Sequence, residues 1–171
     1  WGEDCLDKLN GMFSFAIWNK NNQTLFAARD RFGVKPFYYF IDSKNFYFAS
    51  EINTIFEAGV SKLPNNEVWL NFFSDGSYGL PNETFWKDIK QLEAGHFLTI
   101  KTNHLQIKKW YHFEERIEKL QNHFEPNEEE YITNLLLNAI NLRFRADVPV
   151  GFNLSGGLDS STLLALIDQQ N

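Results

Sequence analysis

This sequence has too few cysteines for a disulfide framework and no segment long enough for a membrane anchor. Its 171 residues include a single cysteine, Cys5, which excludes an internal disulfide and a multi-cysteine metal site. The apolar runs are of strand length, well below the ~20 residues that a membrane-spanning helix requires. No signal peptide is recognisable, so we expect a cytoplasmic protein without a membrane partner.

Basic residues are also scarce. Lys and Arg number 16 against 22 Asp and Glu, which gives a net charge of −6, and the longest basic block is Lys108-Lys109. A nucleic-acid partner is therefore not expected. Aromatic residues are abundant, with 17 Phe, 6 Tyr and 5 Trp, and 43% of the residues are hydrophobic. This composition predicts a globular protein with a sizeable core.

The first two-thirds of the chain predict antiparallel hairpins. Short apolar runs alternate with turn residues such as Asn19–Asn22. The expected strand pairs are 12–18 with 24–30, 37–41 with 46–49, and 96–100 with 105–110. The first pair is apolar at nearly every position, so we expect it to be buried on both faces, as in a sheet between layers.

Less regular segments lie between these hairpins. Ser50 is expected to cap a short helix over 51–58, which Gly59 ends. Residues 61–85 carry Pro64 and Pro81 and are predicted to be a loop with one short strand at 67–73.

The composition changes near residue 114, which predicts three parts: 1–113, a polar linker at 114–126, and 127–171. In the last part, Asn127 and three following glutamates predict the start of a helix over 128–145. Pro149 then precedes a short apolar run at 150–154 of the kind found in a buried parallel strand.

The turn after that run has the composition of a phosphate-binding site. Ser155 is followed by the adjacent glycines Gly156 and Gly157, which allow backbone N–H groups to converge on an anion. Ser160 and Ser161 then open a helix whose N-terminus adds free donors. A simpler interpretation is a strand, turn and helix with ordinary capping and no ligand.

Asp159 is the residue in this turn that favours a ligand of a particular kind. A carboxylate beside phosphate is repelled unless a divalent cation lies between them. Mg²⁺ is typically held by one or two carboxylates together with phosphate oxygens, so Asp159 predicts Mg²⁺. The segment is not a Walker A loop, because the terminal lysine of that motif is missing.

The motif SGGLDSS at 155–161 resembles the PP-loop of N-type ATP pyrophosphatases, which split ATP into AMP and pyrophosphate while adenylating a substrate. Upstream segments resemble the later half of a class II glutamine amidotransferase domain: LNGMFSFAIW at 9–18, LFAARDRFGVKPFYY at 25–39 and FASEI at 48–52. An amidotransferase domain followed by a PP-loop is the arrangement of the glutamine-hydrolysing asparagine synthetases. The DVPVG segment at 147–151 is similar to that family too.

The resemblance implies an α/β fold, with a layered α+β amidotransferase part at 1–113, a linker at 114–126, and the start of a parallel-sheet nucleotide domain at 127–171. It implies an ATP-dependent amidation of aspartate by glutamine-derived ammonia through β-aspartyl-AMP. The substrates would be glutamine, aspartate and ATP, with Mg²⁺ as cofactor, and a homodimer is compatible with it. The implied ATP and pyrophosphate contacts are Leu154, Ser155, Gly156, Gly157, Asp159, Ser160 and Ser161, with Asp159 holding Mg²⁺ through pyrophosphate.

In this family the amidotransferase nucleophile is an N-terminal cysteine. Position 1 here is Trp1, and Cys5 matches no catalytic position, so no catalytic residue is assigned in this chain. We therefore expect an internal piece of a longer enzyme that is inactive by itself in both half-reactions.

Two alternatives stay open from the sequence. One is a related amidotransferase that acts on another carboxylate substrate, because the phosphate motif is shared among such enzymes. The other is a non-catalytic module that binds nucleotide or serves in assembly.

Other chemistry-bearing residues receive structural interpretations. Arg29 and Asp30 lie among apolar residues, so a structural ion pair or an inter-domain role is favoured over catalysis. Glu51 is interpreted as a charge at a helix N-terminus. Metal binding is not expected of the four histidines, whose spacing is irregular.

Overall fold

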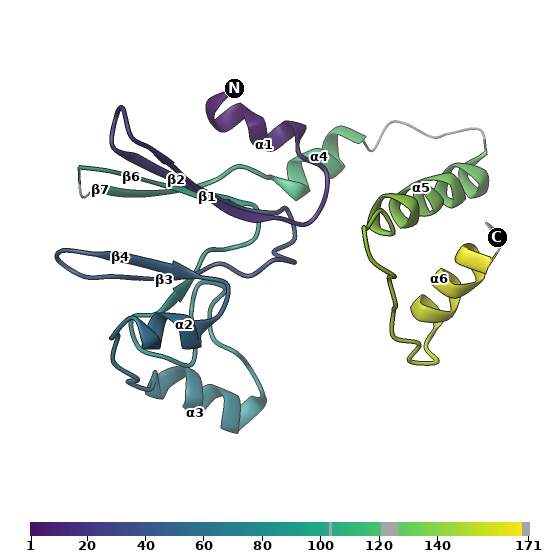
Figure 1. Ribbon diagram of the computed structural model, residues 1–171. Helices are drawn as coiled ribbons and strands as arrows, with labels where there is room; N and C mark the ends of the chain where they lie inside the picture. Colours follow the sequence, from purple (N-terminus) through teal and green to yellow (C-terminus); the bar gives the residue numbers. More distant parts are fainter. Residues whose placement is uncertain (103, 121–126, 169–171) are drawn as a thin grey trace. The chain divides into compact units, whose positions relative to one another are not determined.

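The structure is a computed structural model that describes residues 1–102, 104–120 and 127–168 (Figure 1). The chain divides into two compact units, Trp1–Phe113 and Glu114–Asn171. No helix in the described ranges is long and apolar enough to cross a membrane.

Unit 1 contains two antiparallel sheets. The four-stranded sheet has the order β1-β2-β6-β7, formed by Ser14–Asn19, Thr24–Arg29, His96–Lys101 and His104–Lys109. The three-stranded sheet has the order β4-β3-β5, formed by Phe46–Ala49, Tyr38–Ile41 and Lys90–Gln91. The three hairpins predicted from turn residues are therefore confirmed as β1–β2, β3–β4 and β6–β7.

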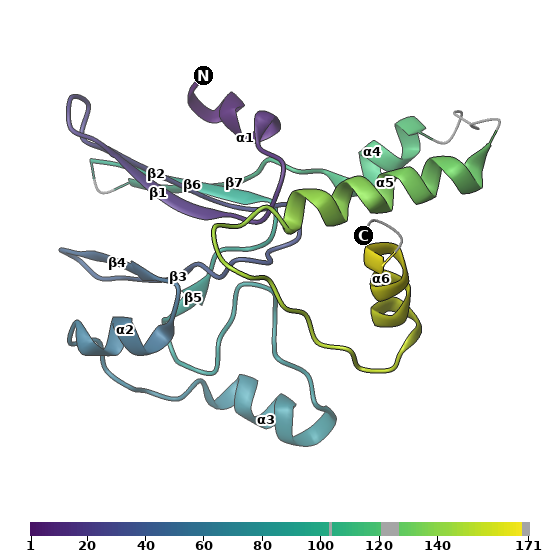
Figure 2. The same ribbon diagram turned by 45° about the vertical axis from the view of Figure 1, so that its right-hand side comes forward.

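The two sheets lie one above the other, with a helix outside each of them (Figures 1 and 2). A buried cluster fills the space between the sheets: Ala27, Phe37, Tyr39, Leu92 and Leu98. Outside the larger sheet, Leu6 of α1 (Cys5–Lys8) packs on Ala28 and Phe97. Outside the smaller sheet, α2 (Ile52–Glu57) buries Ile55 and Phe56 against Ile89. The resulting layers are helix, sheet, sheet and helix.

The expected burial of both strands of the first hairpin is only half right. Ala27 and Ala28 of β2 are fully buried and face opposite clusters. On β1, Ile17 and Trp18 are each 54% exposed. The reason is that β2 lies between two strands, whereas β1 is at the edge of the sheet.

The loop with a short strand expected at 67–73 is wrong, because α3 spans Asn66–Asp75. Val68 is fully buried, and Trp69 and Phe72 lie on Phe85, at ring-centroid distances of 4.4 and 5.3 Å. These positions recur at helical spacing, and packing against Phe85 decides between helix and strand. Gly76, with φ 78°, ends the helix.

The predicted cap of α2 is also wrong. Glu51, not Ser50, occupies the N-cap position, and no side chain caps it. Gly59 does follow the end of this helix, with φ 97°, and its N–H donates to the Phe56 carbonyl at 2.9 Å.

In unit 2, α5 (Glu128–Arg143) confirms the predicted helix, and Asn127 lies at its N-cap position. The segment predicted as a linker begins with α4 (Phe113–Leu120), and its residues 121–126 lie outside the described ranges. The parallel strand predicted at 150–154 is not formed. A strand needs a neighbour for its backbone groups, and the described residues of unit 2 provide no other strand. The last helix, α6, spans Leu158–Asp168.

The carboxylate of Asp30, at the end of β2, organises the loop that follows it. Asp30 is 2% exposed. Its oxygens accept the backbone N–H groups of Phe13 (3.2 Å), Phe32 (3.2 Å), Val34 (2.9 Å) and Lys35 (2.9 Å). Burial alone raises the pKa of this carboxyl, but the four donors outweigh burial and leave the pKa below its usual value.

The neighbouring Arg29 is buried and is also satisfied by the backbone. Its Nε donates to the Lys35 carbonyl at 2.7 Å, its Nη1 to the Leu92 carbonyl at 2.6 Å and its Nη2 to the Gly33 carbonyl at 2.6 Å. With its amide oxygen turned toward the guanidinium, Gln91 accepts from it as well. Arg29 thus ties the larger sheet to the segment around β5 of the smaller sheet. A structural role is therefore confirmed, but hydrogen bonds to the backbone carry it, and not the ion pair or inter-domain contact that the sequence suggested.

We predict that Asp30→Asn lowers the free energy of unfolding by about 2–3 kcal/mol at neutral pH. The amide keeps the shape but places its NH₂ group against backbone N–H donors and leaves the buried Arg29 without a nearby negative charge. Chemical denaturation followed by circular dichroism measures the change. Asp4→Asn, an exposed carboxylate in the first turn of unit 1, is the control and should change stability by a few tenths of a kcal/mol.

The same pair of variants gives a pH dependence. Because the folded-state pKa of Asp30 lies below the ordinary value of 3.8, its stabilisation is fully present above that value. The stabilisation is lost as the pH falls from 3.8 through the lower folded-state pKa. Asp30→Asn should therefore lose less stability than the parent chain on acidification below this pH. Equal losses in the two proteins would contradict the assignment.

Candidate phosphate-binding site

The turn that precedes α6 is shaped by contacts among its own residues. Gly156 has φ 79°, a left-handed conformation that glycine adopts without strain. The Ser155 Oγ lies 3.0 Å from the Ser160 Oγ and accepts the Gly157 N–H at 3.3 Å. Ser160 also donates to the Gly157 carbonyl at 3.2 Å. Ser155, Gly156, Gly157 and Ser160 are therefore brought together, while their contact with phosphate stays a prediction.

The start of α6 adds backbone donors next to this turn. The first hydrogen bond that leads into the helix runs from the Ser161 N–H to the Gly157 carbonyl, at 3.1 Å. The N–H groups of Leu158, Asp159 and Ser160 precede it and have no acceptor one helical turn back. With the helix dipole, these groups favour an anion at this end. Apart from Gly156 and its two chain neighbours, no heavy atom of the described residues lies within 4 Å of where a Cβ on Gly156 would be, so this side is open.

Two of the predicted contact residues lie to one side of the turn. Leu154 is 56% exposed. Together with Ser161 it lines a separate cavity of about 450 Å³ along α6, whose other lining residues are Leu164, Ala165 and Asp168.

Asp159 is exposed in the first turn of α6 and contributes a carboxylate beside the donors of the turn. No group of three or more His, Cys, Asp and Glu side chains in the described residues is arranged to hold a metal ion by itself. One carboxylate beside a phosphate site suits Mg²⁺, which takes its remaining ligands from phosphate oxygens and water. Asp159 is therefore the residue of this turn that could hold Mg²⁺ together with a phosphate ligand.

In unit 1, Cys5 is half-buried and packs against the cluster of Leu6, Ala28 and Phe97.

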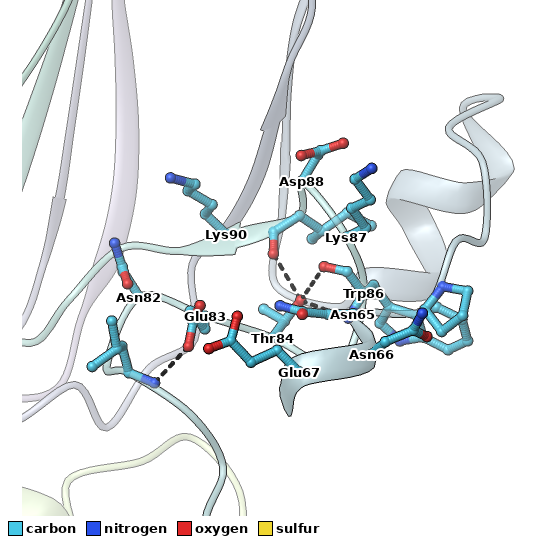
Figure 3. A pocket seen from close by; sticks show the side chains of 13 residues that line it. Asn65, Asn66, Glu67, Asn82, Glu83, Thr84, Trp86, Lys87, Asp88 and Lys90 are labelled. Carbon is cyan, nitrogen blue, oxygen red and sulfur yellow. Dashed lines mark hydrogen bonds between the residues drawn. The ribbon is translucent and has the colours of Figure 1, made fainter. Parts of the chain in front are cut away.

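Unit 1 also contains an open polar cavity that the sequence did not indicate (Figure 3). It has a volume of about 560 Å³ and lies beside the start of α3. The Thr84 hydroxyl organises its wall: it accepts the Trp86 N–H at 3.1 Å and lies 3.0 and 2.7 Å from the carbonyls of Trp86 and Ile89. Its exposed charged residues are of both signs: Glu67, Lys87, Asp88 and Lys90.

Comparison with known families divides the chain into two regions. Residues 1–111 match the family model of the glutamine amidotransferase domain. The chain belongs to that family. Residues 131–171 match the asparagine synthase family, and they include the candidate phosphate turn. The resemblance found in the sequence motifs is therefore confirmed: an amidotransferase region is joined to a region of asparagine synthase type.

Curated relatives match this chain over nearly its whole length. Asparagine synthetase [glutamine-hydrolyzing] 3 of Bacillus subtilis is 38% identical over 97% of this chain and 27% of its own length. Putative asparagine synthetase [glutamine-hydrolyzing] 2 of Methanocaldococcus jannaschii is 35% identical over 97% of this chain and 32% of its own length. Amidase chyE of Penicillium rubens is 34% identical over 98% of this chain and 25% of its own length. The chain spans about a quarter to a third of the length of these relatives.

We predict that Gly156→Ala loosens the turn, because a left-handed conformation costs a residue with a Cβ about 1–2 kcal/mol. Amide hydrogen exchange at Ser161 should accelerate by roughly five- to thirtyfold. Gly151→Ala is the matched control, because Gly151 also has open space beside it but its φ is not positive. If both variants exchange alike at Ser161, the conformation of Gly156 does not maintain the turn.

Proposed function

We propose that this chain is part of a glutamine-hydrolysing asparagine synthetase, which amidates aspartate through β-aspartyl-AMP and releases AMP and pyrophosphate. One observation carries the proposal: the SGGLDSS turn forms a donor-lined helix start, and it lies in the region of asparagine synthase type. The amidotransferase region in the same chain supplies the other half of the proposed chemistry.

In the proposed reaction the aspartate β-carboxylate attacks the α-phosphorus of ATP, and pyrophosphate leaves with the bonding electron pair. Negative charge accumulates on the leaving group. Backbone N–H groups at the start of α6, with the Ser155 and Ser160 hydroxyls, would donate to those oxygens. The backbone donors are held in place by the turn itself, whereas the Ser160 hydroxyl would first have to release the Gly157 carbonyl, to which it donates at 3.2 Å.

Asp159 would hold Mg²⁺ on the open side of the turn. The ion would offset the negative charge of the pyrophosphate oxygens when it is bound. Leu154 and Ser161, which line the adjoining cavity, would border the ATP molecule and not the phosphates alone.

The amidotransferase region would supply ammonia from glutamine, but none of its described residues is assigned as the nucleophile. Cys5 is the only cysteine, and it packs against an apolar cluster. The 171-residue chain by itself is therefore expected to hydrolyse no glutamine and to form no asparagine. Its cytoplasmic location and a homodimeric assembly stay predictions.

A second candidate is amidation of a different carboxylate substrate. The similarity to amidase chyE, 34% identical over 98% of this chain, supports this second candidate. The phosphate turn would act alike in both cases, because it faces ATP and not the acceptor. Comparing aspartate with other carboxylates as acceptors, in a chain as long as the relatives, separates the two candidates. A third, non-catalytic nucleotide-binding role would show ATP binding without turnover in that longer chain.

We predict that the 171-residue chain binds pyrophosphate in the presence of Mg²⁺, as measured by isothermal titration calorimetry. Ser155→Ala should weaken this binding about tenfold, since it removes one hydrogen bond to a charged oxygen. Asp159→Asn should abolish the dependence of binding on Mg²⁺.

Asp147→Asn is the control for Asp159→Asn, because it removes an exposed carboxylate upstream of the turn and should leave binding unchanged. Equal effects of the two aspartate substitutions, or no binding by the parent chain, would count against the proposed site.

A further inference from the structure

The open polar cavity beside the start of α3 has no part in the chemistry proposed for the phosphate turn. It is formed entirely by unit 1 and has a volume of about 560 Å³. One wall is the start of α3, from Pro64 to Glu67, and the other is the segment from Leu80 to Lys90 (Figure 3). A cavity of this size is within the range of small-molecule sites.

Backbone hydrogen bonds tie the two walls together. The Asn65 N–H donates to the Phe85 carbonyl at 2.9 Å, and the Lys87 N–H donates to the Leu63 carbonyl at 2.8 Å. These bonds form an isolated antiparallel bridge between the walls. The buried Thr84 hydroxyl holds the second wall from within. The cavity is therefore formed before any ligand binds, which lowers the entropy that binding costs.

Charged side chains of both signs line this cavity. Glu67, Glu83 and Asp88 contribute carboxylates, and Lys87 and Lys90 contribute ammonium groups. Glu83 accepts the Leu80 N–H at 2.8 Å. Among the described residues, the other four charged side chains form no hydrogen bond or ion pair, although they line one cavity. Their charges are therefore available to a ligand.

This lining disfavours several kinds of ligand. A phosphate would lie beside the carboxylates of Glu67 and Glu83, which repel it. No three His, Cys, Asp or Glu side chains of the described residues are arranged around a metal ion here or elsewhere. An apolar molecule would remove water from the charged groups without replacing its hydrogen bonds. A polar ligand that carries charges of both signs meets none of these objections.

The charged groups are spread along the cavity. In the view of Figure 3, Lys90 extends toward the left, Lys87 and Asp88 extend toward the upper right, and Glu67 and Glu83 lie below them. Lys87 and Asp88 are adjacent in the chain, so their charges offset each other. Lys90 is then the cation, and the two glutamates the anions, that are left for a ligand with separated charges.

Uncharged polar side chains complete the lining. Asn65, Asn66 and Asn82 contribute three carboxamides, each of which both donates and accepts hydrogen bonds. Asn65 occupies the N-cap position of α3, but its side chain makes no capping hydrogen bond. Its carboxamide is therefore free to bind a ligand. These groups favour a ligand that has its own uncharged donors and acceptors besides its charges.

We propose that this cavity binds a free α-amino acid with an uncharged polar side chain, in its zwitterionic form. Glu67 and Glu83 bind the ammonium group, Lys90 binds the carboxylate, and the asparagines bind the side chain. The dipole of α3 opposes a cation at this end, but two carboxylates outweigh its partial charge. The inference rests on unit 1 alone and does not depend on the proposed function.

The test is a titration of the 171-residue chain with L-asparagine, followed by isothermal titration calorimetry and by amide chemical shifts in NMR spectra. L-Asparagine should bind and should shift the amide signals of Glu67, Asp88 and Lys90. The signals of Gly156 and Gly157, in the phosphate turn, should not move.

Glu67→Gln and Lys90→Gln should each weaken this binding about five- to tenfold, because each removes one charged partner of the ligand. Glu57→Gln and Lys109→Gln are the matched controls. Both remove an exposed charge of the same kind from unit 1 outside the cavity and should leave binding unchanged. Circular dichroism checks that the variants fold.

Two analogues assign each charge to its partner. N-acetyl-L-asparagine lacks the ammonium group, and L-asparagine amide lacks the carboxylate, so each should bind the parent chain more weakly than L-asparagine. Glu67→Gln should not weaken the acetyl compound further, and Lys90→Gln should not weaken the amide further. The analogues test the charges on the parent chain, so the proposal stays testable if a variant does not fold.

Absence of binding at about 10 mM L-asparagine would overturn the proposal. Equal binding of L-asparagine and both analogues would overturn it too, as would shifts centred on Gly156 and Gly157. Mg²⁺-dependent pyrophosphate binding, measured on the same samples, separates the two proposals. Loss of that binding with L-asparagine binding intact would contradict the proposed function and not the amino-acid site.

Discussion

The fold of unit 1 depends on a buried carboxylate at the point where β2 leaves its sheet. Asp30 binds the backbone at Phe13, just before β1, and at three positions of the loop that follows it. One side chain thereby fixes where β1 begins and how the chain passes toward the second sheet. Arg29, one residue earlier, reaches the Leu92 carbonyl beside β5. Arg29 at the end of β2 thus connects the two sheets, and Asp30 after it fixes the loop between them.

This arrangement limits which residues fit nearby. Gly33 has φ 65°, and a Cβ there would lie 3.0 Å from the Arg29 Cζ. A larger residue would both strain the backbone and displace the guanidinium from the Gly33 carbonyl. The spacing of arginine, aspartate and glycine at 29, 30 and 33 is therefore one structural unit. Its charges are matched to backbone groups, which explains how two charged residues lie at the centre of an apolar fold.

Local signals in the sequence were enough for the hairpins and for α5, because turn residues and helical spacing act over a few positions. They were not enough for α3, whose aromatic residues become helical through contacts with Phe85. The strand at 150–154 needed a neighbour that the described part of unit 2 does not contain. The phosphate turn was predictable in outline, since glycine and serine positions define it. The cavity that Leu154 and Ser161 line along α6 was not, because it depends on where the helix lies relative to the segment before it.

The two units also differ in how far they are stabilised by their own contacts. Unit 1 has three buried apolar clusters, whereas the buried apolar side chains in the described part of unit 2 are Ile140 and Leu166. Leu158 is 84% exposed at the very start of α6. The hydrogen bonds of the phosphate turn, by contrast, all join residues within 155–161. The turn can therefore keep its shape through local contacts, while the position of α6 needs apolar partners for its exposed leucines. Shape and placement of the site are thus determined by different parts of the sequence.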